Sequence, residues 1–230
     1  MATSPFSHTS GIDVKKSVPF ELVHSDVMVP IKPVSKGGSK YIVTFIDYYS
    51  RMVFVYPIKA KSEVFEKFKM SKAQFETQYD SKIRCICFDN GGEYTSKRFN
   101  QYCANQGIAH QTSAPYSPQQ NGLAERINRS LGEGTRALLM HMYVARVWWA
   151  KALMTVAHMI NRAPNSARVG MSLWKSLTGN KLDLSYFRVF GLSGYYRDDD
   201  SKRTKLDSKA NRFMFLRYSE TSKSYRVWDY

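Results

Sequence analysis

Three acidic residues occupy positions where an α/β fold would bring them together. Asp26 falls within the first apolar run of the chain, Asp89 directly follows a later run, and Glu125 lies about two turns into a long predicted helix. Because ligands of open α/β sheets gather at one edge, beyond the strand ends, we expect the three carboxylates to converge there. Such a trio suits Mg²⁺. Two such ions ~3.5–4 Å apart could support phosphoryl transfer. The set alone is a weak signal, because most acidic side chains are merely solvated.

The residues around Asp89 strengthen this interpretation. Asp89 belongs to the segment F-D-N-G-G-E-Y at 88–94, whose glycines allow a sharp turn after a buried strand. Thirty-five residues separate Asp89 from Glu125. The helix that carries Glu125 has a clear start, with Ser117 as the cap, Pro118 at the first helical position and an S-x-x-Q capping box.

The elements that must position these acids follow from the apolar pattern. Short runs rich in Val, Ile, Phe and Tyr predict strands, and stripes at helical spacing predict helices. In chain order the prediction is strands at 21–31, 41–46 and 52–58, a helix at 61–79, a strand at 83–88, a helix at 95–106, a strand at 108–111, a loop at 112–117, the long helix, and helices at 144–162 and 171–177.

Three regions are expected along the chain. Residues 1–18 read as a flexible N-terminal tether, and 19–180 as the core with its trailing helices. Residues 187–230 read as a small β-module, with extended segments at 188–190, 195–196, 212–217 and 225–228.

Composition limits the classes of partner. The 230 residues carry 34 Lys and Arg against 19 Asp and Glu, a net charge of +15, which favours a polyanion, with nucleic acid ahead of an anionic membrane. The three cysteines include no C-x-x-C pair, which argues against a disulfide framework and a four-cysteine zinc site. No signal peptide or membrane span is expected, because the apolar runs are too short.

Four segments together resemble the integrase catalytic core of copia-type retrotransposons, within the wider retroviral integrase family. They are H-S-D at 24–26, D-N-G-G-E-Y at 89–94, A-P-Y-S-P-Q-Q-N-G at 114–122 and A-E-R at 124–126. The resemblance implies an RNase H-like fold, with a five-stranded mixed sheet flanked by helices and a small C-terminal β-barrel. It also implies that Asp26, Asp89 and Glu125 form a catalytic triad that binds Mg²⁺ (or Mn²⁺).

The resemblance further implies activity and partners. Integrases of this family trim the DNA ends of their element and transfer them into target DNA, so the expected partners are DNA and further copies of the chain. A nuclear location with a cytoplasmic stage is also expected. Two alternatives stay open: a catalytically inactive DNA-binding remnant, and a nuclease of RNA–DNA hybrids. The 35-residue spacing and the P-Q-Q-N-G loop favour the integrase over the nuclease.

The predicted DNA contacts lie on the loop and on the long helix. At 100° per residue, one helix face is opposite Leu123 and Ile127. That face is predicted to carry Glu125 together with DNA-binding groups. The DNA-binding residues are predicted to be Tyr116, Gln119, Asn121, Asn128 and Arg129. Arg129 could equally be a solvated charge, and Tyr116 could equally be a packing residue.

Other residues have structural interpretations that compete with functional ones. His24 is expected to orient its neighbour on the strand rather than bind metal, and Asp47 to satisfy a hairpin turn. Trp148 and Trp149 are expected in the core rather than stacked on bases. The basic stretch 202–205 reads as a solvated face or a nuclear import signal.

Three features depart from the family pattern. No zinc-binding module with paired His and Cys ligands precedes Phe20, and Arg217 and Val29 replace residues that are commonly Gly. Gly132 and Gly134 stand in the long helix, where each costs ~1 kcal/mol relative to Ala. These departures predict a decayed or truncated copy in which the acidic triad is intact.

Overall fold

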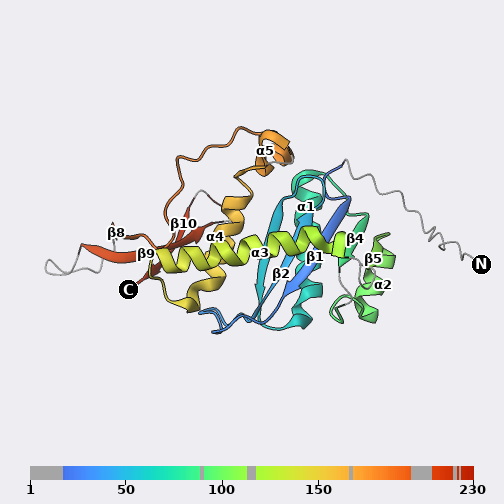
Figure 1. The fold of residues 1–230 in the computed structure, drawn as a ribbon, viewed down its shortest axis with the longest axis horizontal. Coiled ribbons are helices and arrows are strands. Elements are labelled where there is room, and N and C mark those ends of the chain that lie inside the picture. Colours follow the sequence, from blue (N-terminus) through green and yellow to red (C-terminus); the bar gives the residue numbers. More distant parts are fainter. Residues whose placement is uncertain are drawn as a thin grey trace, which may run out of the picture.

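A five-stranded mixed sheet forms the centre of the molecule (Figure 1). The computed structural model describes residues 18–88, 91–112, 118–165, 168–197, 209–219, 222 and 224–230. The strand order is β3-β2-β1-β4-β5, with β1 antiparallel to β2 and parallel to β4. The strands are β1 (Leu22–Met28), β2 (Tyr41–Asp47), β3 (Val53–Ile58), β4 (Cys85–Phe88) and β5 (Ala109–Thr112).

Two helices cover one face of the sheet. They are α1 (Val64–Tyr79), preceded by a short 3-10 turn (Lys61–Glu63), and α2 (Lys97–Asn105). Ser96 caps α2, because its side chain accepts a hydrogen bond from the amide of Phe99 at 3.3 Å. The core on this side is largely aromatic, and Phe68 and Phe99 stack at 5.1 Å within it. The helices predicted at 61–79 and 95–106 are therefore present with slightly shorter bounds.

Two further helices, α3 (Pro118–His141) and α4 (Trp149–Ile160), cover the opposite face. Gly134 of α3 lies so close to α4 that a Cβ atom there would stand 2.8 Å from Cγ1 of Val156. The glycine that weakens α3 as a helix former thus permits the close approach of the two helices. The predicted helix 144–162 starts late, because Ala145 has a non-helical ψ of 138° and a 3-10 turn (Arg146–Trp148) precedes α4.

The chain between α4 and the C-terminal strands is more ordered than the pattern predicts. Strands β6 (Pro164–Asn165) and β7 (Arg168–Ser172) form a two-stranded ladder, which the sequence analysis does not predict. Helix α5 (Leu173–Thr178) begins at 173 rather than 171, because Ser172 is its cap and accepts a hydrogen bond from the amide of Lys175.

The C-terminal region forms an antiparallel sheet in the order β10-β9-β8, from β8 (Ser193–Arg197), β9 (Ala210–Tyr218) and β10 (Tyr225–Asp229). This sheet lies at the end of α3 away from β5 (Figure 1). The extended segment predicted at 188–190 is not a strand. Instead, the amide of Arg188 donates to the hydroxyl of Tyr218, and Gly191 donates to the carbonyl of Phe215.

Two residues with competing interpretations have structural positions. The buried carboxylate of Asp47 accepts hydrogen bonds from the amides of Phe20 (2.7 Å) and Ser50 (2.8 Å), so it closes the turn between β2 and β3. Trp149 is buried, and its indole N–H donates to the carbonyl of Pro33 at 2.8 Å. Trp148 is half-buried against Trp228 of β10. No helix in the described part of the chain is long and apolar enough to cross a bilayer.

Candidate active site

Asp26 lies near the end of β1, the central strand of the sheet. Its side chain is half-buried, on the strand face toward α3. The Oδ2 atom accepts a hydrogen bond from Nδ2 of Asn128 at 2.6 Å. A charge-assisted bond of this length fixes the orientation of the carboxylate.

Helix α3 brings Glu125 to the same region. Glu125 lies one turn before Asn128 and is exposed, and Arg129, next to Asn128, is exposed as well. Asn128 itself is only 8% exposed. The structure therefore corrects the predicted helix face: Asn128 points toward the sheet and Asp26 instead of sharing the outward face. The reason is that the innermost residues of α3 are Ala124, Asn128 and Leu131, so the buried stripe is centred one position later than Leu123 and Ile127.

The segment after β4 is attached to β1 by a tyrosine. Tyr94 is fully buried, and its ring stacks on Phe88, the last residue of β4, at 4.6 Å. Its hydroxyl forms a 2.6 Å hydrogen bond with the hydroxyl of Ser25, the neighbour of Asp26. Tyr94 thus packs on the end of β4 and bonds to β1. The sequence analysis misses Ser25 and Tyr94, because nothing in the pattern pairs two residues 69 positions apart.

The predicted site residues are only partly described. Asp26, Glu125, Asn128 and Arg129 are described, and the structure joins the strand of Asp26 to the helix of the other three. Asp89 and Tyr116 lie outside the described residues, as do the side chains of Gln119 and Asn121.

The donor set is suitable for a hard cation. Asp26 and Glu125 offer carboxylate oxygens, which Mg²⁺ and Mn²⁺ prefer, and Asn128 already orients one of them. Among the described residues, no three His, Cys, Asp or Glu side chains form a group that could hold a metal. Asp89, the third acid of the predicted triad, lies outside the described residues.

The histidine on β1 and the three cysteines have structural positions in the described part of the chain. His24 is buried and stacks on Tyr48 at 5.6 Å, in agreement with a strand histidine. The three cysteines are buried and free, and burial raises the pKa of the Cys85 and Cys103 thiols to about 12. These two thiols therefore stay protonated at neutral pH.

Comparison with solved structures defines the class of fold. The chain superimposes with a TM-score of 0.59 on a chain of a simian T-cell lymphotropic virus intasome in complex with PP2A regulatory subunit B56 gamma, covering 92% of this chain and 77% of that one at 20% identity. The HTLV-2 integrase catalytic core domain in complex with magnesium gives a TM-score of 0.53 at 20% identity, covering 70% of this chain and 97% of that one. The central sheet and its helices are thus an integrase, RNase H-like fold, as predicted.

Sequence comparison defines the family. Residues 16–118 match the Integrase core domain, and residues 193–230 match the Retroviral polymerase SH3-like domain. The chain belongs to the integrase core domain family, in the branch of the copia-type retrotransposon Pol polyproteins. The C-terminal three-stranded sheet is accordingly the SH3-like part.

Two plant relatives illustrate the similarity. The chain is 38% identical over 212 residues to the Retrovirus-related Pol polyprotein from transposon TNT 1-94 of Nicotiana tabacum, covering 91% of this chain and 16% of that protein. It is 33% identical over 222 residues to the Pol polyprotein from transposon RE2 of Arabidopsis thaliana, covering 96% of this chain and 15% of that protein. The chain therefore spans about a sixth of the length of these relatives.

Proposed function

We propose that this chain is a metal-dependent polynucleotidyl transferase that trims the DNA ends of a retrotransposon and joins them to target DNA. The hydrogen bond from Asn128 to Asp26 carries the proposal, because it sets the helix of Glu125 directly against the strand of Asp26. Membership of the integrase core family supports the type of reaction. The polyprotein relatives are much longer than this chain, so their activities do not transfer to it directly. The proposal therefore depends on the residues of this chain's own site.

Asp26, Asp89 and Glu125 are the proposed ligands of Mg²⁺ or Mn²⁺. Strand β4 is parallel to β1 with His24 opposite Cys87, so β4 ends on the side of the sheet toward which β1 carries Asp26. A bound divalent cation would supply activation of the attacking oxygen and stabilisation of the leaving oxygen. The structure of the similar HTLV-2 integrase catalytic core domain in complex with magnesium supports this choice of metal.

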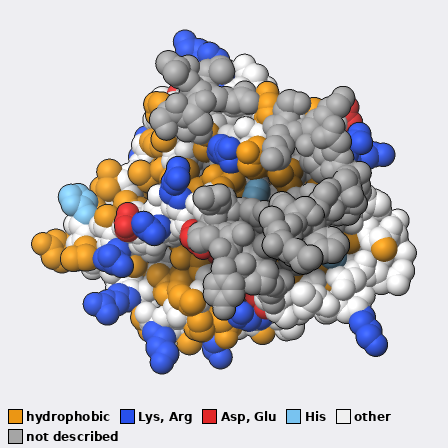
Figure 2. Space-filling model, turned by 45° about the vertical axis from the view of Figure 1, so that its right-hand side comes forward, with side chains coloured by type: hydrophobic (Ala, Val, Ile, Leu, Met, Phe, Trp, Pro, Cys, Tyr) orange, Lys and Arg blue, Asp and Glu red, His pale blue; other side chains and the backbone are white. Residues whose placement is uncertain are grey.

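The proposed role of the chain's own residues is to hold this geometry and the DNA. Asn128 bonds one oxygen of Asp26 and so fixes the orientation of that carboxylate. Arg129, exposed beside Glu125, is proposed to contact a phosphate, with Tyr116, Gln119 and Asn121 as further DNA contacts. On the face drawn in Figure 2, Lys and Arg side chains clearly outnumber acidic ones, in keeping with a net charge of +15.

Assembly and location are part of the same proposal. The related viral proteins are described in an intasome and in dimeric and trimeric forms, so we propose that this chain acts as a homo-oligomer on DNA. Integration into chromosomal DNA would require a nuclear stage after a cytoplasmic one. The regions 1–18, 19–180 and 187–230 are kept as the proposed tether, core and β-module.

A strand-transfer assay with labelled element-end DNA and a target plasmid tests the proposal. We expect a product that requires Mg²⁺ or Mn²⁺ and that disappears in Asp89→Asn and Glu125→Gln. The matched control is Glu133→Gln, which removes an exposed carboxylate two turns further along α3 and should leave the product unchanged.

Three results would reject the transferase. Product formation that survives Asp89→Asn would remove the triad from the mechanism. Binding to DNA that persists in excess chelator, with no metal-dependent product, would support the DNA-binding remnant instead. Cleavage of RNA–DNA hybrids without strand transfer would support the nuclease.

A further inference from the structure

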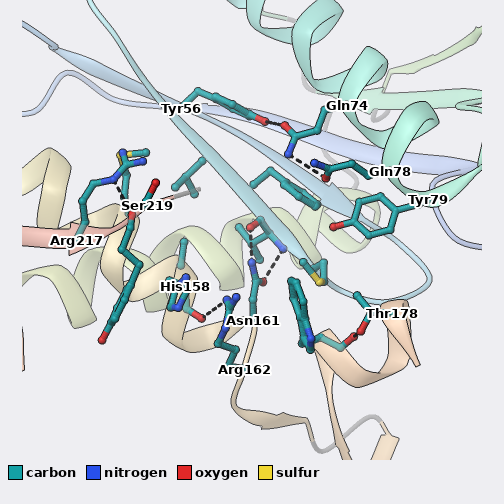
Figure 3. Close-up of a pocket in the computed structure, with 18 residues that line it drawn as sticks. Tyr56, Gln74, Gln78, Tyr79, His158, Asn161, Arg162, Thr178, Arg217 and Ser219 are labelled. Atoms are coloured by element: carbon teal, nitrogen blue, oxygen red, sulfur yellow. Dashed lines mark hydrogen bonds between the residues drawn. The ribbon is translucent and has the colours of Figure 1, made fainter. Parts of the chain in front are cut away.

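A groove of about 400 Å³ lies at the open edge of the central sheet, along β3. Helix α1 forms one wall and the end of α4 forms the other, with α5 and the end of β9 at the two extremities (Figure 3). Strand β3 is two strands away from β1, so the groove is separate from the acidic site. Its volume is within the ~300–1,000 Å³ of ligand pockets.

The edge of β3 offers backbone groups to this groove. The amide of Asp47 donates a hydrogen bond to the carbonyl of Met52. From there along the antiparallel ladder, successive residues of β3 alternately bond to β2 and face away from it. Val53 and Val55 therefore direct their N–H and C=O groups away from β2, into the groove. Pro57, the next residue of this set, has no N–H, so the hydrogen-bonding edge is short.

A side chain already uses this edge as a partner strand would. Asn161, after α4, accepts a hydrogen bond from the N–H of Val53 at 2.9 Å and donates one to its C=O at 2.8 Å. The two contacts reproduce a β-ladder pair with a side-chain amide (Figure 3). Val55 is the next outward-facing residue in the same groove. No described side chain forms a hydrogen bond with its N–H or C=O.

The charges in the groove have one sign. Arg162 and Arg217 are among its lining residues, and none of the described lining residues is acidic. The guanidinium of Arg162 lies over the ring of Trp174 at 4.7 Å, and its Nη1 donates to the carbonyl of His158. Arg162 forms no ion pair with a described carboxylate, and its Nε is buried without a hydrogen-bond partner in the described structure. A half-buried cation of this kind attracts an anion.

We propose that this groove binds an extended acidic peptide, which adds to β3 as a short strand. The peptide backbone pairs with the N–H and C=O of Val55, and a carboxylate side chain reaches Arg162. Trp174 and Tyr79 provide an aromatic surface for the neighbouring side chain. The occupant is a peptide because it alone among anionic polymers presents both a backbone donor and a backbone acceptor at strand spacing.

Fluorescence polarisation with a labelled peptide that alternates Glu and Val tests the binding, and a peptide that alternates Lys and Val is the charge control. The whole chain should bind the Glu peptide at least about tenfold more tightly than the Lys peptide. Arg162→Gln should weaken binding of the Glu peptide by about tenfold. Arg146→Gln removes an exposed cation outside the groove and should not weaken it.

Hydrogen exchange locates the peptide without relying on a variant. Adding the Glu peptide should slow exchange of the Val55 amide and leave the amides of Phe54 and Tyr56, which already pair with β2, unchanged. Unchanged exchange at Val55, or equal affinity of Arg162→Gln and the unaltered chain, would overturn the proposal. So would displacement of the peptide by an oligothymidylate, which would make the groove a nucleic-acid site. Protection of Val55 in the free chain at dimer-forming concentration would assign the edge to a second copy.

Discussion

At the scale of single residues, Asn128 joins the helix of the proposed site to its strand. Its amide donates to Asp26 at 2.6 Å from a position only 8% exposed. An asparagine is the residue type that permits this contact, because its Nδ2 donates while its size is close to that of aspartate. The hydrogen bond holds the carboxylate in one orientation.

Asn128→Asp should destabilise the metal-free protein in a pH-dependent way. Two carboxylates at hydrogen-bond distance cannot both ionise, so the folded-state pKa of the pair rises above its unfolded value. The loss of stability, about 1–3 kcal/mol at neutral pH, should therefore shrink as the pH falls through that raised pKa. Urea unfolding in chelator at neutral and acidic pH measures it.

Asn128→Ala is the control for this prediction. It removes the hydrogen bond without adding a charge, so its cost of about 1 kcal/mol should not depend on pH in the same way. Adding Mg²⁺ should restore more stability to Asn128→Asp than to Asn128→Ala. Identical pH profiles for the two variants would show that the contact with Asp26 is not formed in solution.

His158 gives a second pH effect at this scale. Its ring stacks on Tyr218 at 4.2 Å, and burial, with Arg162 and Arg217 nearby, lowers its pKa to about 3. The unfolded chain binds the proton more readily, so stability should fall as the pH decreases from 6.5 toward 3. The loss should be on the order of 1–2 kcal/mol by about pH 4, allowing for the part of the ring that stays in water.

The variant His158→Gln isolates this effect. Other groups also titrate in this range, so the informative quantity is the difference in unfolding free energy between the variant and the unaltered chain. That difference should narrow as the pH falls. Only the unaltered chain has a buried imidazole that stays neutral when folded and binds a proton when unfolded, so only it loses stability in this way. A constant difference would mean that folding does not lower the pKa of His158.

At the scale of elements, two glycines of α3 differ in what surrounds them. A Cβ atom at Gly132 would meet nothing within 4 Å, whereas one at Gly134 would stand 2.8 Å from Cγ1 of Val156. Gly132→Ala should stabilise the protein by about 1 kcal/mol through helix propensity. Gly134→Ala should destabilise it by about 1–3 kcal/mol, because the β-branched Val156 cannot move aside.

Thermal or urea unfolding of the two variants compares them directly. The double variant Gly134→Ala with Val156→Ala should recover part of the loss, because it removes the atoms that the new methyl group meets. Equal stabilisation by both single changes would contradict the close packing of α3 on α4.

The sequence predicts the elements better than their contacts. Strands β1 to β5 and helices α1 to α3 follow from apolar runs and caps, because each pattern is local. The ladder β6–β7 is missed, since its strands are too short to show alternation. The inward position of Asn128 is missed because a helical projection gives relative angles only. The side that faces the sheet depends on how Ala124 and Leu131 pack.

In the candidate site, too, the elements are predicted and the contacts between them are not. Asp26 and Glu125 are predicted from residue type, spacing and family resemblance, and the structure brings their elements together. The hydrogen bond between Ser25 and Tyr94 could not be predicted, because it depends on the register of β4 against β1 and on the course of the chain after Phe88.

At the scale of the whole molecule, the C-terminal sheet and the core share a buried cluster. It joins α4 to β9 and consists of Val144, Ala152, Phe190, Met214 and Leu216. Thr155 of α4 also donates to the carbonyl of Leu216 at 3.1 Å. An apolar contact that both parts need for burial couples their unfolding, so the SH3-like sheet should not unfold independently of the core.

Leu216→Ala tests this coupling. Leu216 is 3% exposed, so the change should cost about 2–5 kcal/mol through lost burial and a cavity. If the two parts unfold together, hydrogen exchange of core amides in β1 should accelerate as much as that of amides in β9. The control is Val227→Ala in the same sheet, whose side chain is 42% exposed and should change neither. Acceleration confined to β9 would show that the C-terminal sheet opens as a separate unit, because the cluster on α4 would then contribute nothing to the stability of the core.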